Sequence, residues 1–268
     1  MLEDSMPLNL QPNLTSGAKM TEIAPGIIHL EIPAGTNGAY RLAQLDDYSD
    51  LPRRDFPWTA PLRLSITVRV ASATMPGTWG FGFWNDPFSM SLLSRRGMFR
   101  LPLLPNTAWF FSASPPNHLS LYDSLPAQGF LAATFCSTLF PAALSTLSVV
   151  LLPLIVFPSA ARFLRRAARR FVRQAAHCLD LDPTDWHTYN LNWADNRVIF
   201  SVEGGPVFET PLVPAGCLGF VIWVDNQYMA FQPDGHFRYG WLENKQPSWL
   251  DFKELRISQP EAKYNRIH

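Results

Sequence analysis

Hydrophobic and polar residues alternate along most of the chain, which is typical of β-strands with one buried and one solvent-facing side. The run LRLSITVRVAS shows this most clearly, because its polar residues Ser65, Thr67 and Arg69 fall between apolar ones. The apolar residues share one strand face: Leu64, Ile66, Val68 and Val70. Similar runs, including GIIHLEIP, GTWGFGFW, NTAWFFSAS and RVIFSVEGG, are separated by turn-forming Gly, Asn, Asp and Pro.

These runs predict a mainly β fold, an antiparallel β-sandwich with a helical insertion. We expect one sandwich domain formed by residues 21–126 and 181–260, with flexible tails at 1–20 and 261–268. The insertion is expected at residues 127–180, where the alternation stops.

The segment from Phe130 to Phe157 is long and apolar enough to be a membrane-spanning candidate. A single crossing would separate flanks whose strands must hydrogen-bond in one sandwich, so we expect an apolar helical hairpin or re-entrant loop, kinked at Pro141. A basic amphipathic helix should follow, with an apolar stripe formed by Leu164, Ala168, Phe171, Ala175 and Cys178. Its other face carries the arginines expected at a membrane surface: Arg162, Arg165, Arg166, Arg169 and Arg173.

The alternative is that residues 130–175 pack on the sandwich itself or on a second copy of the chain, as a homo-oligomer interface.

Composition argues against several classes of function and site. The net charge is zero and only 16% of residues are charged, which argues against a general nucleic-acid binder. The three cysteines, Cys136, Cys178 and Cys217, indicate neither a disulfide framework nor a metal site, and we expect no cofactor. The first residues lack the apolar core of a signal peptide, so we expect a cytoplasmic protein, peripheral or monotopic at a membrane.

A candidate ligand site comes from two strands with the same spacing, GFGFWND and GFVIWVD. Each places a Trp and an Asp on one strand face and has an Asn next to the Asp. The expected site residues are Trp84, Asn85, Asp86, Trp223, Asp225 and Asn226. The glycines beside them leave room for a ligand to approach the sheet. His187 and Tyr189, on a further predicted strand, are added to this expected site. The same tryptophans would equally suit a core, and an Asp-Asn pair would equally suit a turn.

Three stretches resemble the concanavalin A-like lectin/glucanase superfamily, especially the laminarinase-type glycoside hydrolases of family sixteen. They are DWHTYNLNWADNRVIFSVEGG, PGTWGFGFW and SWLDFKELRI. The resemblance implies a jelly roll of two curved sheets. The family's catalytic strand, Glu-x-Asp-x-x-Glu, should follow PGTWGFGFW, but the next strand-like run is NTAWFFSAS, which has no acid.

We therefore expect a non-catalytic, membrane-associated, lectin-like module that binds a glycan, glycolipid or apolar ligand on a concave sheet lined by Trp and Asp. One alternative is a divergent glycoside hydrolase that acts on a polysaccharide with Asp86 and Asp225 as its acid pair. Another is a structural or assembly protein whose apolar hairpin is an oligomer interface.

Overall fold

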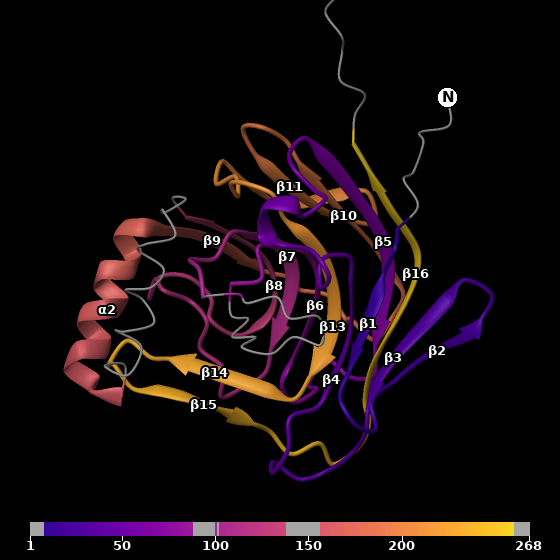
Figure 1. Ribbon diagram of the computed structural model, residues 1–268, viewed down its shortest axis with the longest axis horizontal. Coiled ribbons are helices and arrows are strands. Elements are labelled where there is room, and N and C mark those ends of the chain that lie inside the picture. The colour runs from indigo at the N-terminus through magenta and orange to yellow at the C-terminus, as the bar shows by residue number, and fades with distance from the viewer. Residues whose placement is uncertain (1–7, 88–99, 101, 138–155, 260–268) are drawn as a thin grey trace, which may run out of the picture.

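The computed structural model describes residues 8–87, 100, 102–137 and 156–259, which form two large antiparallel sheets packed face to face (Figure 1). The first sheet has the strand order β1-β4-β13-β6-β7-β8-β9. Its strands are β1 (Gln11–Leu14), β4 (Leu42–Asp46), β13 (Gly219–Asp225), β6 (Thr78–Trp84), β7 (Thr107–Ala113), β8 (Gly129–Ser137) and β9 (Val172–Cys178).

The second sheet has the order β12-β11-β10-β5-β16-β3-β2. Its strands are β12 (Gly205–Thr210), β11 (Val198–Val202), β10 (His187–Trp193), β5 (Leu62–Val70), β16 (Ser248–Ser258), β3 (Ile27–Ile32) and β2 (Lys19–Ala24). A 3-10 turn (Arg53–Asp55), a hairpin of β14 (Gln227–Phe231) and β15 (Phe237–Trp241), and the helix α2 (Pro158–Phe171) complete the described elements. The predicted mainly β sandwich is confirmed.

The core lies between the sheets, as the alternating pattern requires. The apolar face of β5 is at most 1% exposed at Leu64, Ile66, Val68 and Val70. Phe81 and Phe110 reach it from the first sheet and contact Tyr189 of the second at ring-centroid distances of 5.2 and 5.0 Å.

Early and late parts of the chain are interleaved in both sheets. Strand β4 pairs with β13, so that Leu42 lies opposite Asp225, and β3 pairs with β16, so that Leu30 lies opposite Leu250. Strands from before and after the apolar segment are therefore hydrogen-bonded neighbours in both sheets.

The helical character expected throughout 127–180 is wrong at both ends of that range. Residues 129–137 form β8 and residues 172–178 form β9, and β8 pairs along its length with β7 and β9. Strand β8 is apolar because it is buried on both faces: Leu131, Ala132, Ala133 and Thr134 are at most 4% exposed. Residues 138–155, including the expected kink at Pro141, lie outside the described residues. No described helix has both the length and the apolar character to cross a bilayer.

Helix α2 is present, but the predicted apolar stripe does not lie along one face of it, because the helix ends at Phe171 and β9 begins at Val172. Ala161 and Arg165 face the protein at 0% and 2% exposure, whereas Phe171 is exposed and Cys178 is an exposed residue of β9. On this side of the helix Arg165 donates to the carbonyls of Ser120, in a loop, and Phe231, at the end of β14. The N-terminal segment also differs from expectation, because residues 11–14 of the predicted tail form β1 and pair with β4.

Candidate ligand-binding face

The outer side of the first sheet, opposite the core, carries large aromatic side chains. Alternation places every second residue of β13, β6, β7 and β8 there. We call the following residues the aromatic face: Trp84, Thr107, Trp109, Phe111, Phe135 and Trp223. Trp84 and Trp223 were predicted to share a face, and the structure brings their rings to a centroid distance of 6.1 Å with 7° between their planes.

The glycines of β6 allow these rings to meet across a strand. Trp223 of β13 lies opposite Gly80, and Trp109 of β7 lies opposite Gly82. A Cβ at Gly80 would lie 2.9 Å from Trp223 Cη2, and one at Gly82 would lie 2.7 Å from Trp109 Cβ. The room that the sequence suggested for a ligand is therefore occupied by the two indole rings, whose centroids are 5.6 Å apart.

Burial is uneven across the aromatic face. Trp109 and Trp223 are 6% and 7% exposed, and Thr107 is fully buried. Trp84 is only half-buried, and its ring also meets Tyr48 edge-on at 6.2 Å. The side of the face nearest Trp84 is therefore the part that a ligand reaches first.

Several polar atoms on the aromatic face are poorly paired. Among the described residues, the buried Nε1 of Trp109 and Oγ1 of Thr107 have no hydrogen-bond partner; Nε1 of Trp84 makes no hydrogen bond of good geometry, although it lies close enough to the Tyr48 hydroxyl to affect its pKa. Trp84 and Thr107 are direct cross-strand partners, and Trp109 follows two residues after Thr107. By contrast, Trp223 Nε1 donates to Thr78 Oγ1 at 3.0 Å. Buried donors are usually paired, so this group of atoms makes the aromatic face a candidate site; the buried Trp193 Nε1 and Thr134 Oγ1, away from this face, are unpaired in the same way.

Four members of this face were missed as site residues: Thr107, Trp109, Phe111 and Phe135. The run NTAWFFSAS identifies a strand, and its alternation puts Trp109 and Phe111 on one side. Nothing local to the run shows that this side is the outer one, because Phe110, on the core side, is equally apolar.

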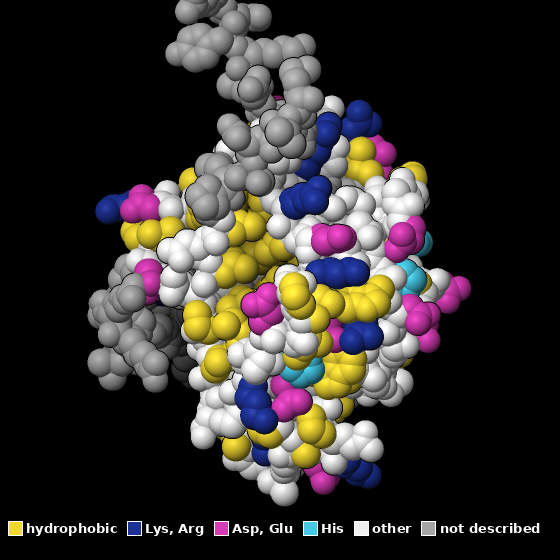
Figure 2. Space-filling model, turned by 90° about the vertical axis from the view of Figure 1, so that its right-hand side faces the viewer, with side chains coloured by type: hydrophobic (Ala, Val, Ile, Leu, Met, Phe, Trp, Pro, Cys, Tyr) yellow, Lys and Arg dark blue, Asp and Glu magenta, His cyan; other side chains and the backbone are white. Residues whose placement is uncertain are grey.

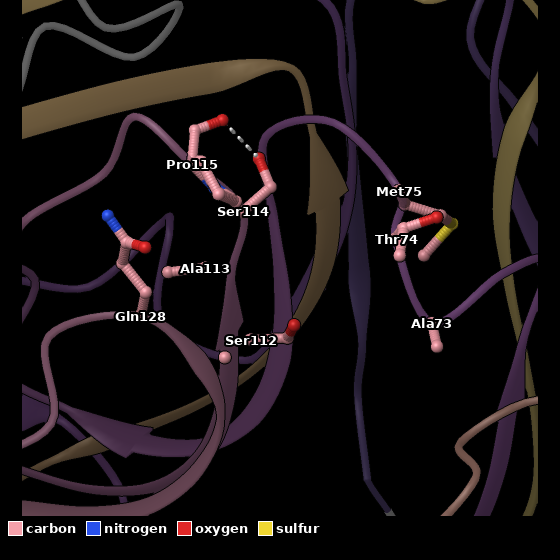
Figure 3. Close-up of a pocket in the computed structure, with 9 residues that line it drawn as sticks. Ala73, Thr74, Met75, Ser112, Ala113, Ser114, Pro115 and Gln128 are labelled. Atoms are coloured by element: carbon pink, nitrogen blue, oxygen red, sulfur yellow. Dashed lines mark hydrogen bonds between the residues drawn. The ribbon is translucent and has the colours of Figure 1, made fainter.

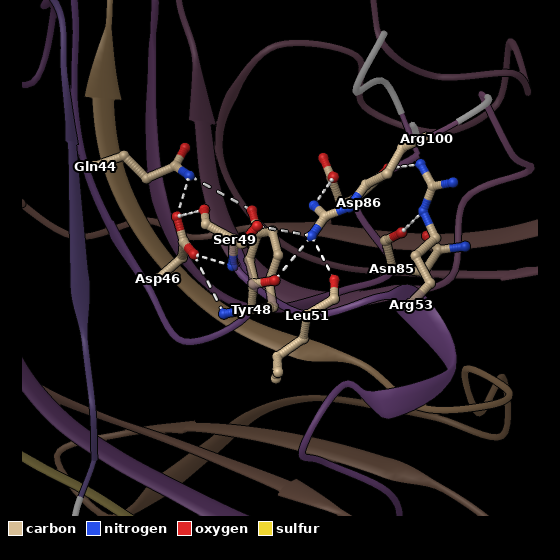
Figure 4. A network of polar contacts seen from close by, with 9 residues as sticks. All are labelled: Gln44, Asp46, Tyr48, Ser49, Leu51, Arg53, Asn85, Asp86 and Arg100. Atoms are coloured by element: carbon tan, nitrogen blue, oxygen red, sulfur yellow. Dashed lines mark hydrogen bonds and ion pairs between the residues drawn. The ribbon is translucent and has the colours of Figure 1, made fainter. Parts of the chain in front are cut away.

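Asp86 lies in a polar network beside Trp84 and is held by an arginine (Figure 4). Its Oδ2 accepts a hydrogen bond from Arg100 Nη1 at 2.7 Å, and both side chains are less than 10% exposed. Arg100 Nη2 also donates to the carbonyls of Tyr48, Ser49 and Leu51. The carboxylate is thus an anchor for the loop that follows β4.

Gln44 and Asp46 of β4 form the other half of that network. Asp46 is fully buried and accepts hydrogen bonds from Gln44 Nε2 at 2.8 Å and Ser49 Oγ at 2.7 Å (Figure 4). By register, Gln44 lies opposite Trp223, so the network borders the aromatic face with amide and carboxylate groups.

Asp225 is buried at the opposite end of the face. Its Oδ1 accepts hydrogen bonds from the backbone and hydroxyl of Thr78 at 3.1 and 2.8 Å, and from the backbone of Gln227 at 3.2 Å. Burial raises the pKa of Asp225 to about 7. These contacts tie the start of β6 to the end of β13.

Asp86 and Asp225 are too far apart to act as a glycosidase pair. Strands β6 and β13 are antiparallel neighbours, with Asp225 opposite Thr78 at the start of β6 and Asp86 beyond Trp84 at its end. At 3.3 Å per residue these ends are about 20 Å apart, whereas retaining and inverting chemistry need roughly 5 to 9.5 Å. The expected acid pair is therefore not formed.

The two asparagines expected to bind ligand are engaged in turns. Asn85 Nδ2 donates to the Leu104 carbonyl at 2.9 Å, and its Oδ1 accepts from the Asn106 backbone at 3.0 Å. Asn226 is fully buried and bonds the backbones of Ala39, Arg41 and Leu242. Both side chains hold loops together, as the turn interpretation of the Asp-Asn pairs requires.

His187 and Tyr189 do not belong to the aromatic face, because β10 lies in the second sheet. Tyr189 points into the core, 1% exposed, and burial raises its pKa above the ordinary value. His187 is on the same side of β10 as Tyr189, at the end of the strand, where its ring lies 6.1 Å from the Tyr189 ring and its Nε2 contacts the Asp182 carbonyl at 2.9 Å. On the outer side of the second sheet, hydrophobic and charged side chains are interspersed (Figure 2). Arg69 lies over the rings of Trp186 and Trp249 there.

Two hollows are open to solvent. One, of about 320 Å³, has the hydroxyl-bearing Thr74, Ser112 and Ser114 and the Gln128 amide among its lining residues, and no charged side chain (Figure 3). The other, of about 340 Å³, contains Asp47 beside Trp58. Burial raises the pKa of Asp47 to about 6, but its oxygens accept from Trp58 Nε1 and the Phe220 backbone. Asp50 also lines the second hollow, so that hollow holds two carboxyl groups, whereas the first holds none. No cluster of metal-ligating side chains occurs in the part of the chain that the structure describes.

No protein-family model matches this sequence, and no curated protein matches it significantly. Among solved structures, a glycoside hydrolase family 16 endo-glucanase from Bacteroides ovatus is 9% identical with a TM-score of 0.49, covering 92% of this chain and 94% of that one. The catalytic domain of a laminarinase from Thermotoga petrophila is 10% identical, with a TM-score of 0.43 and coverages of 92% and 82%. A pseudo β-1,3-glucanase of Mycobacterium tuberculosis is 10% identical, with a TM-score of 0.47 and coverages of 96% and 93%.

These are the laminarinase- and endoglucanase-type proteins that the sequence resemblance indicated. Other similar structures are much longer: the chain spans 17% of a sialidase and 54% of an endo-β-galactosidase from Clostridium perfringens. Identities of 9–10% and TM-scores below 0.5 do not assign a function to this chain.

Proposed function

We propose that this protein is a non-catalytic carbohydrate-binding module and that the aromatic face is its binding surface. The observation that supports the proposal is a set of buried groups among stacked rings that make no hydrogen bond of good geometry with the described residues: the indole N–H of Trp84, the indole N–H of Trp109 and the hydroxyl of Thr107. A sugar supplies both complements, since its C–H faces pack on indole rings and its hydroxyls accept from indole N–H groups.

The geometry favours binding over hydrolysis. Strand β7, which pairs with β6 and corresponds to the run NTAWFFSAS, presents Thr107, Trp109 and Phe111 to the outer side instead of carboxylates. The nearest acids are committed to structural bonds: Asp86 with Arg100, Asp46 with Gln44 and Ser49. An apolar floor with few polar groups suits a ligand held by stacking and by a small number of hydrogen bonds.

Trp84 provides the entrance in this proposal. It is the half-buried ring of the group, it lies parallel to Trp223, and its ring contacts Tyr48, the loop residue next to the network of Gln44, Asp46 and Asp86. A sugar ring that stacks on Trp84 lies next to Thr107 and Trp109 on β7; because both are buried in the unbound protein, their polar atoms meet its hydroxyls only when the side chains around them move aside.

Isothermal titration calorimetry with laminari-oligosaccharides, xylo-oligosaccharides and galacto-oligosaccharides tests the proposal. The double variant Trp84→Ala/Thr107→Val should lose at least tenfold in affinity for whichever oligosaccharide binds, because stacking and a hydrogen bond are each worth about 1 kcal/mol. Trp186→Ala/Trp249→Ala, on the outer side of the second sheet, is the matched control and should bind normally. Equal losses in both variants, or no binding by the wild-type chain, would refute the assignment.

A further inference from the structure

Helix α2 presents a row of arginines to solvent. Arg162, Arg166 and Arg170 recur every four residues, so they lie on one side of the helix, and all three are exposed. The helix contains no acidic residue. The helix therefore has no carboxylate of its own to pair with these arginines. Like charges four residues apart on a helix repel each other and destabilise it.

The other arginines of the helix are used for anchoring. Arg165 and Arg169 share the carboxylate of Asp123, at 2.8 and 2.9 Å. Arg169 Nε also donates to the Leu121 carbonyl, and Tyr122 Oη donates to the carbonyl of Arg169 at 3.1 Å. Among the described residues, Arg162 donates to the Asp234 carbonyl in the turn between β14 and β15 and to Ser159 Oγ, and Arg166 donates to the Arg162 carbonyl.

The turn between β14 and β15 fixes which side of the helix faces outward. Gly235 has a φ of +90°, and a Cβ there would lie 2.2 Å from the Pro158 carbonyl oxygen and 2.7 Å from Arg162 Cγ. The helix start therefore rests directly on this turn (Figure 1). Together with buried Arg165, this contact holds the arginine row in a fixed outward orientation.

Large apolar side chains are exposed beside the arginine row. Phe163 is 65% exposed on the helix itself, and Val156 and Phe157, which directly precede it, are 76% and 62% exposed. A helix that combines arginines with exposed phenylalanine is typical of a protein surface that lies in the headgroup region of a membrane.

We propose that the exposed side of α2, formed by Phe157, Arg162, Phe163, Arg166 and Arg170, docks on an anionic lipid bilayer. The arginines complement phosphate headgroups, and the two phenylalanines enter the boundary with the acyl chains. The exposed phenylalanines favour lipid over nucleic acid, because a phosphate backbone gives them no apolar environment. Docking through α2 leaves the aromatic face as a separate site.

Flotation with vesicles of phosphatidylcholine, with and without phosphatidylglycerol, tests the proposal on the full chain. The wild type should float with the phosphatidylglycerol vesicles and stay at the bottom with phosphatidylcholine alone. Arg166→Gln/Arg170→Gln should weaken the partitioning by roughly 30-fold, since each arginine near the surface contributes about fivefold. Phe163→Ser should also weaken it.

Arg54→Gln/Arg63→Gln is the matched control, because both arginines are exposed, lie outside α2 and remove the same charge. It should float like the wild type. Three outcomes would overturn the proposal: no flotation of the wild type, equal weakening by both double variants, or retention on single-stranded RNA in place of anionic vesicles. Thermal melting of each variant separates lost docking from lost folding.

Discussion

The anchoring of α2 by Arg165 gives a quantitative prediction for the change Arg165→Met. Arg165 is 2% exposed, and its Nη1 donates to the carbonyls of Ser120 and Phe231. Methionine fills much of the same volume, but it leaves both buried carbonyls without their hydrogen-bond donor. Each unsatisfied carbonyl costs about 1 to 3 kcal/mol of stability. The ion pair with Asp123 adds little, because that carboxylate is 53% exposed and keeps Arg169. Two such acceptors together give an expected loss of about 2 to 6 kcal/mol in unfolding free energy.

Urea denaturation followed by tryptophan fluorescence measures this loss. Arg166→Met is the matched control, since Arg166 is the next residue, is exposed and makes one local contact at 3.4 Å. Its stability should stay within about 0.5 kcal/mol of the wild type. The explanation fails if the two variants differ by less than about 0.5 kcal/mol, because Arg165 would then hold nothing that Arg166 does not.

Three further predictions concern the sandwich. Gly82→Ala should destabilise the protein by at least about 2 kcal/mol, because at a φ of +148° the new Cβ would lie 2.5 Å from the Ala108 carbonyl oxygen. Gly26→Ala is the control: Gly26 also has a positive φ but open space around it, so the substitution should cost less stability in the same denaturation series. Burial raises the folded pKa of Asp225 to about 7, so its protonated form favours folding: stability should fall as pH rises from about 4 to about 7, and Asp225→Asn should remove that part of the slope. Asp86→Asn should lower the melting temperature, because Arg100 is 9% exposed and would lose its counter-charge; an unchanged melting temperature would contradict the role given to this pair.

The strands and their burial could be predicted from the sequence because alternation is a local signal. The apolar face of β5 and the common side of Trp84 and Trp223 are both of this kind. Interleaving of early and late strands could also be inferred, since otherwise neither flank of the apolar segment forms a complete sandwich.

The order in which the strands pair and the burial of individual side chains could not be predicted, because both depend on residues far away in the sequence. Strand β8 has the apolar composition of a membrane segment only because it is buried on both faces. Two strands with the same motif bring their tryptophans together when they are antiparallel neighbours, but the same pairing sends Asp86 and Asp225 to opposite ends. Arg165 is buried because the carbonyls of Ser120 and Phe231 lie beside it and accept its hydrogen bonds. The periodicity of the helix sequence does not show that these carbonyls are there.

The central claim, that unpartnered groups of the aromatic face receive a sugar, is tested most directly by indole ¹⁵N–¹H spectra of the full chain during titration with a binding oligosaccharide. The account predicts that the Nε1–H signals of Trp84 and Trp109 move on saturation, because these donors gain an acceptor. The signal of Trp58, whose Nε1 already donates to Asp47, should stay in place. Saturation of binding with Trp84 and Trp109 unmoved would contradict the account.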